Sequence, residues 1–180
     1  MLTLNIQGRE LYDEEKEEFL TVEPITLLLE HSLISLSKWE SKTLKPFLST
    51  LDKSSEETMD YVEAMILNPN FPPGVVGLLT PQDFDAINAY IESPHSATTF
   101  GKMPPTKGKG ETITAELIYY WMVAFQIPFE CERWHLNRLF ALIRICNVKN
   151  SKPTKMSKQE LARQYHELNQ KRKAELGTSG

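Results

Sequence analysis

Apolar and polar residues alternate at the start of the chain, where residues 2–6 (LTLNI) show the two-residue period of a half-buried β-strand. Residues 25–39 (ITLLLEHSLISLSKW) carry apolar side chains on both alternating sets. That pattern is typical of one or two strands, although residues 27–36 also fit a helix. We expect the two segments to pair in a small N-terminal sheet.

Helical patterns begin near residue 54. Ser54 and Glu57 form a capping-box pattern at the start of SSEETMDYVEAMIL, and the proline-rich segment NPNFPPG ends that helix. Thr80 and Pro81 suit the cap and the first position of the next helix. The apolar face of this second helix consists of Phe84, Ile87, Tyr90 and Ile91.

The second half of the chain contains a loop and three more helical patterns. Residues 94–111 are rich in glycine, proline, threonine and lysine without periodicity, and we expect a mobile surface loop. Residues 112–127 are apolar almost all the way round, which predicts a helix buried on most sides. Pro128 separates this helix from another over residues 129–148. Ser157 and Glu160 then form a capping-box pattern for a last helix, which ends near Gly177.

These patterns together predict an α+β fold that is mainly α, with about five helices in its core and a small N-terminal β element. We expect three parts along the chain. They are an N-terminal β-containing segment (1–50), a helical core with the loop (51–150), and a basic C-terminal helix and tail (151–180).

Composition and charge refine this picture. The chain has 41% hydrophobic and 24% charged residues, which is ordinary for a globular protein. It contains no apolar run long enough to span a bilayer and does not begin with a secretory signal pattern. The two cysteines lie in one predicted helix, too far apart for a disulfide, so we expect the protein to reside in a reducing cytoplasm. Residues 9–23 are strongly acidic and residues 149–173 strongly basic, while the net charge is −4.

Cys131, Glu132 and His135 are the first candidates for chemistry, because their spacing would bring them together on a helix as metal ligands. On a helical wheel, however, Cys131 and His135 share a stripe with leucines, and a structural zinc site needs a second pair of ligands elsewhere in the chain. We therefore favour inert core residues over a metal site.

The other candidate patterns do not point to catalysis either. The lysines and glycines at residues 107–110 lack the strand-to-helix turn of a phosphate loop, and the acidic run YDEEKEEF resembles a solvated face. We expect a protein that is not an enzyme and that needs no cofactor. We also expect its partners to include neither a membrane nor nucleic acid, although the basic segment 149–173 keeps DNA binding as a hypothesis that a salt titration would test.

Three stretches carry a resemblance to a known family: residues 30–49 (EHSLISLSKWESKTLKPFLS), residues 114–150 and residues 155–180. They resemble small proteins from the tail-gene modules of long-tailed, siphovirus-like bacteriophages, which we connect with tail assembly chaperones. The resemblance implies a protein of the host cytoplasm that binds the phage tape-measure protein and helps tail tube proteins to assemble around it.

An alternative is a structural component of the virion, such as a neck, tail or head accessory protein, that acts through self-association as a homo-oligomer. For either function we expect contact residues in or beside loops and on the basic helix. The candidates are Phe47, Leu48, Phe71, Met103, Lys158, Arg163, Lys171 and Arg172.

Overall fold

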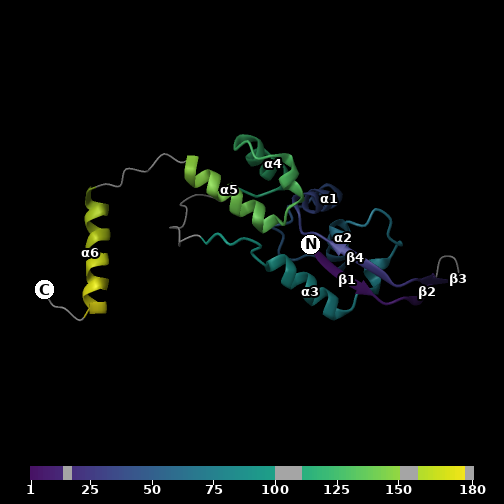
Figure 1. Ribbon diagram of the computed structural model, residues 1–180. Coiled ribbons are helices and arrows are strands. Elements are labelled where there is room, and N and C mark those ends of the chain that lie inside the picture. Colours follow the sequence, from purple (N-terminus) through teal and green to yellow (C-terminus); the bar gives the residue numbers. More distant parts are fainter. Residues whose placement is uncertain (14–17, 100–110, 151–157, 177–180) are drawn as a thin grey trace. The chain divides into compact units, whose positions relative to one another are not determined.

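A computed structural model describes residues 1–13, 18–99, 111–150 and 158–176 (Figure 1). The elements, in chain order, are β1 (Leu2–Ile6), β2 (Arg9–Asp13), β3 (Glu18–Val22), β4 (Ile25–Leu29), α1 (Leu33–Thr43), α2 (Ser55–Met65), the 3₁₀-helix η1 (Val75–Leu78), α3 (Pro81–Glu92), α4 (Ala115–Ala124), the 3₁₀-helix η2 (Phe129–Arg133), α5 (Leu136–Asn150) and α6 (Lys158–Leu176). The chain divides into two units, Met1–Cys146 and Asn147–Gly180.

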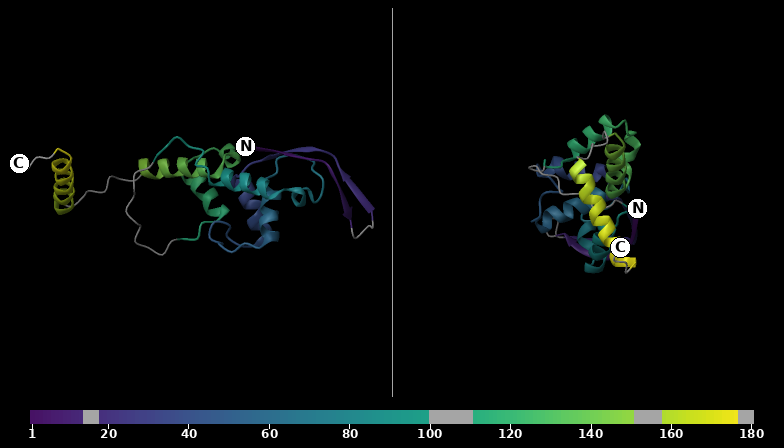
Figure 2. Two further views of the ribbon diagram at one scale, coloured as in Figure 1. Left: turned by 90° about the horizontal axis from the view of Figure 1, so that it is seen from below. Right: turned by 90° about the vertical axis from the view of Figure 1, so that its left-hand side faces the viewer.

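The strands form two antiparallel pairs, β1 with β4 and β2 with β3. The register continues from the first pair into the second: the paired residues run from Leu2 opposite Leu29 to Asp13 opposite Glu18. The break between them contains Pro24, which has no N–H to donate to a ladder. The two pairs therefore continue one another as a long hairpin (Figure 2), and the expected pairing of residues 2–6 with the start of residues 25–39 is confirmed.

The outer edge of β4 is covered by the chain that follows α2. The Leu67 N–H donates to the Leu28 carbonyl at 2.8 Å, and the Glu30 N–H donates to the Met65 carbonyl at 2.9 Å. The Asn68 amide accepts from the Leu28 N–H at 2.8 Å and donates to the Thr26 carbonyl at 3.1 Å. These bonds satisfy backbone N–H and C=O groups that would have no hydrogen-bond partner on an exposed edge strand.

Side-chain caps fix where the first three α-helices begin. The expected capping boxes at Ser54 and Thr80 are both present, and Pro81 occupies the first turn of α3. A third capping box, between Ser32 and Ser35, starts α1. The stretch 25–39 is therefore one strand followed by a helix, because this cap ends the extended chain directly after β4.

The predicted helix over residues 129–148 is wrong in its first part. Residues 129–133 form the 3₁₀-helix η2, Trp134 is extended, and α5 begins only at Leu136. The Leu136 N–H donates to the His31 carbonyl at 2.7 Å, and His135 forms a β-bridge with Ser32. These long-range bonds pull residues 134–135 out of helical geometry, so Cys131 and His135 do not share one helical stripe as expected.

Two hydrophobic clusters form the core of the Met1–Cys146 unit. The first contains Leu4, Ile6, Leu27 and Leu29 from the sheet, together with residues of α2, η1 and α3. These strand residues alternate in burial, as a half-buried ladder requires. The second cluster joins α1, α4, η2 and α5. The expected class, mainly α with a small N-terminal antiparallel sheet, is confirmed.

The Asn147–Gly180 unit contains the last turn of α5 and helix α6. Tyr165 and Leu168 of α6 are exposed, with exposed Arg163, Arg172 and Lys173 on the same helix. The predicted cap at Ser157 and the terminator Gly177 lie outside the described residues, as does most of the predicted loop.

Candidate protein-binding surfaces

Helix α4 has apolar side chains on two opposite faces. Its inner face, with Ala115, Ile118 and Met122, is buried in the second cluster. On the outer face Tyr120 and Val123 are 65% and 61% exposed, contrary to the expectation that this helix is buried on most sides. A helix that is apolar all round carries no signal for which face meets solvent, and one face suffices to pack on the neighbouring helices.

Phe129 of η2 extends this exposed surface. Its ring lies 6.3 Å from that of Tyr119, and its side chain is 56% exposed. We call the surface made by Tyr119, Tyr120, Val123 and Phe129 the α4 face. Scattered exposed apolar residues are normal, whereas neighbouring exposed aromatic and aliphatic side chains are typical of contact surfaces.

Acidic residues accompany the α4 face. Glu116 and Glu130 are exposed, one on α4 and one on η2. The Tyr119 hydroxyl donates a hydrogen bond to Glu132 at 2.9 Å. Burial, together with this bond and the nearby carboxylate charge, raises the pKa of Tyr119 to about 12, so the phenol stays neutral at physiological pH. The α4 face is therefore an apolar surface with a negative rim.

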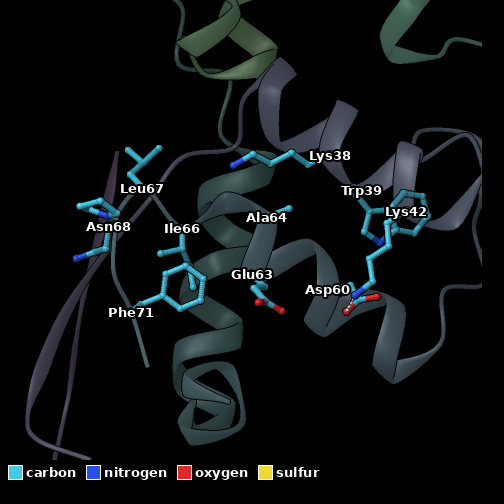
Figure 3. A pocket seen from close by; sticks show the side chains of 11 residues that line it. Lys38, Trp39, Lys42, Asp60, Glu63, Ala64, Ile66, Leu67, Asn68 and Phe71 are labelled. Atoms are coloured by element: carbon cyan, nitrogen blue, oxygen red, sulfur yellow. Dashed lines mark hydrogen bonds and ion pairs between the residues drawn. The ribbon is translucent and has the colours of Figure 1, made fainter. Parts of the chain in front are cut away.

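A groove lies between α1 and the end of α2 (Figure 3). One hollow, of about 490 Å³, is bordered by Lys38 and Lys42 of α1, by α2, and by residues 66–71. A second hollow, of about 450 Å³, reaches from Ser32 and Ile34 to Arg133. The linings of the two hollows share Lys38, Ala64, Ile66 and Leu67, so the hollows are neighbours on the surface, and together we call them the groove.

Three of the six charged side chains that line this groove are paired within the protein. Lys42 forms an ion pair with Asp60 at 2.7 Å (Figure 3). Glu30 accepts from the Tyr90 hydroxyl at 2.7 Å and lies 2.9 Å from the N-terminal amino group. Lys38 and Arg133, both exposed, form no ion pair with any described residue.

Three histidines meet where β4, α3 and α5 come together. The rings of His31 and His135 lie 5.1 Å apart edge to face, and His95 stacks on His135 at 3.9 Å. His31 and His135 are buried, and Nδ1 of His31 is hydrogen-bonded to the Tyr61 hydroxyl. We call this group, with Tyr61 and Tyr90, the histidine cluster.

Both buried rings are held in their neutral form. Nε2 of His135 donates to the Tyr90 carbonyl at 3.1 Å, while Nδ1 accepts from the Asn137 N–H at 3.2 Å. Burial and the neighbouring His135 together lower the pKa of His31 to about 4, against the opposing effect of Glu30. Burial and His95 also lower the pKa of His135. His31 and His135 therefore resist protonation.

The partner residues proposed from sequence are spread over the fold. Phe47 lies half-buried in the core, stacked on Tyr61 at 3.9 Å and edge-on to Trp39 at 5.1 Å. Phe71 lines the groove, and Leu48 is 38% exposed. Arg163 and Arg172 are exposed on α6, whereas Met103 and the side chains of Lys158 and Lys171 lie outside the described residues.

Cys131 is buried and makes no disulfide. Burial and the charge of Glu130 raise the pKa of its thiol, which is the reverse of what activates a nucleophile. Among residues 1–13, 18–99, 111–150 and 158–176, no group of three or more histidine, cysteine, aspartate or glutamate residues is placed to hold a metal ion. Within the same part of the chain, no helix is both long and apolar enough to cross a bilayer.

Comparison of the chain with protein-family models, with curated proteins and with solved structures gave no significant match. The two surfaces are therefore interpreted from their own geometry. Sequence analysis did not predict the α4 face, and of the groove it named only Phe71. Exposure of the α4 face depends on which side of an apolar helix is covered, and the groove is formed by segments far apart in the chain.

Proposed function

We propose that this protein is a non-enzymatic tail assembly chaperone of a long-tailed bacteriophage, which binds the tape-measure protein in the host cytoplasm and assists assembly of the tail tube. The observation that supports a binding function best is the α4 face. Tyr120, Val123 and Phe129 are each more than half exposed on an otherwise well-buried helical cluster.

The shape and charge of the α4 face favour a helical partner. A helix with one apolar stripe can cover a short row of exposed side chains, and basic residues beside that stripe would meet Glu116 and Glu130. The apolar stripes of long helices need a binding partner that covers them until the helices are packed. The phage resemblance implies this task for a chaperone.

The titratable groups described above support a binding role over turnover. The two ring nitrogens of His135 are occupied by backbone partners, and burial disfavours the reactive thiolate of Cys131. These groups contribute to the core, as their burial requires.

The experiment is co-expression of the chain with the tape-measure protein of the same genome, followed by affinity purification and size-exclusion chromatography. We expect a soluble complex and an insoluble partner in its absence. Tyr120→Glu with Val123→Glu should abolish the complex while leaving the unfolding curve nearly unchanged, because both side chains are exposed and glutamate is a good helix former.

Val148→Glu is the matched control, since Val148 is 55% exposed on α5, outside the α4 face. This variant should form the complex normally. Elution of the wild-type chain alone or as a defined ring, together with a fixed copy number in purified particles, would replace the chaperone with the structural virion component.

A further inference from the structure

We propose that the groove between α1 and the end of α2 is a second binding site, separate from the α4 face, for a partner-protein segment that combines apolar and acidic side chains. Its geometry is that of a shallow channel lined by both helices and by residues 66–71. An elongated segment can occupy two neighbouring hollows at once, which a compact ligand cannot.

Part of the groove lining is apolar. Ile66, which is buried, and Leu67, which is 51% exposed, both border the two hollows. Figure 3 shows Ile66, Leu67 and Phe71 on one side of the first hollow and the side chains of α1 on the other. Burying Leu67 and the half-buried Ile34 under a partner side chain would remove apolar surface from water.

Charge selects the kind of segment. Lys42 and Glu30 are already satisfied by Asp60 and by the N-terminal amino group with Tyr90. Lys38 and Arg133, in the second hollow, have no ionic partner among the described residues. A carboxylate of the bound segment would be attracted by both cations, and arginine matches carboxylate geometry particularly well.

The other end of the groove fixes the orientation. Glu63 is exposed in the first hollow, where it would repel an acid. The start of α1 borders the second hollow at Ser32 and Ser35, and the positive end of its helix dipole adds to the attraction there. The acidic residue of the segment therefore lies beside Lys38 and Arg133, and its apolar residue lies over Ile66 and Leu67.

The test is selection of a random dodecapeptide library, displayed on phage, against the full-length chain. We expect enriched peptides to carry aspartate or glutamate next to a large apolar residue. Lys38→Glu with Arg133→Glu should weaken their binding about tenfold or more, measured by fluorescence anisotropy of synthetic peptides. Replacing the acids of the peptides by lysine should restore binding to that double variant.

Arg163→Glu with Arg172→Glu reverses the same number of exposed charges on α6 and should leave peptide binding unchanged. Tyr120→Glu should also leave peptide binding unchanged, so the proposals for the groove and for the α4 face can be refuted independently. The proposal is overturned if no acidic peptides are enriched, or if the Lys38 and Arg133 variant binds them as the wild type does. It is likewise overturned if that variant dissociates a dimer of the chain, because the occupant would then be a second copy.

Discussion

Acid should destabilise this protein through His31, which is buried in the histidine cluster with a folded-state pKa of about 4 against an ordinary value of 6.5. The unfolded chain therefore binds more protons than the folded chain between these two values. Stability is complete above pH 6.5, falls as the pH decreases through this window, and has lost the whole contribution of His31 below pH 4.

The size of the effect follows from the two pKa values. At pH 5 the unfolded ring is almost fully protonated and the folded ring is mostly neutral, so His31 alone costs about 2 kcal/mol relative to pH 7.5. The limiting cost below pH 4 is about 3 kcal/mol. His135, whose pKa is also lowered, adds to the loss in the same direction.

The assay is urea unfolding at pH 7.5 and pH 5.0, followed by tryptophan fluorescence. All three tryptophans lie in the Met1–Cys146 unit, so the signal reports the unit that contains the cluster. His31→Gln removes the titration and should reduce the loss of unfolding free energy between the two pH values by about 2 kcal/mol. Comparing one variant at two pH values cancels any packing defect of the glutamine.

His166→Gln is the matched control, because His166 is exposed on α6. It should show the same pH dependence as the wild type. Equal pH dependence of the wild type and His31→Gln, within about 0.5 kcal/mol, would refute the reasoning, because carboxylates elsewhere would then account for the acid loss.

Two further substitutions test the core. Glu40, buried on α1, accepts hydrogen bonds from the N–H groups of Phe47 at 2.8 Å and Ala115 at 2.7 Å. Glu40→Ala should therefore lower the free energy of unfolding in urea by about 3 kcal/mol. Glu40→Gln, which keeps a single accepting oxygen, should lower it by about half as much. Cys131→Ala should cost about 1 to 2 kcal/mol without changing the metal content, and stoichiometric zinc that this variant loses would contradict the core assignment.

Local signals in the sequence predicted the elements that depend on nearby residues. The caps at Ser54 and Thr80 act within a few residues, and so does the alternation of apolar and polar residues in β1, so these signals can be recognised without the fold. The buried carboxylate of Glu40 and the meeting of His31 with His135 depend on contacts between distant segments. No period or spacing in a single sequence encodes such contacts.

The break at residues 134–135 shows how one long-range bond changes the surface. In a continuous α-helix, with about 100° between residues, Phe129 and Arg133 would lie on one side. In a 3₁₀-helix, with about 120° between residues, residues 129, 131 and 133 point to three different sides. Within η2, Phe129 accordingly belongs to the α4 face, Cys131 to the core and Arg133 to the groove. The hydrogen bond from Leu136 to His31 ends η2 after five residues, and this short helix supplies one residue to each of the two proposed binding surfaces.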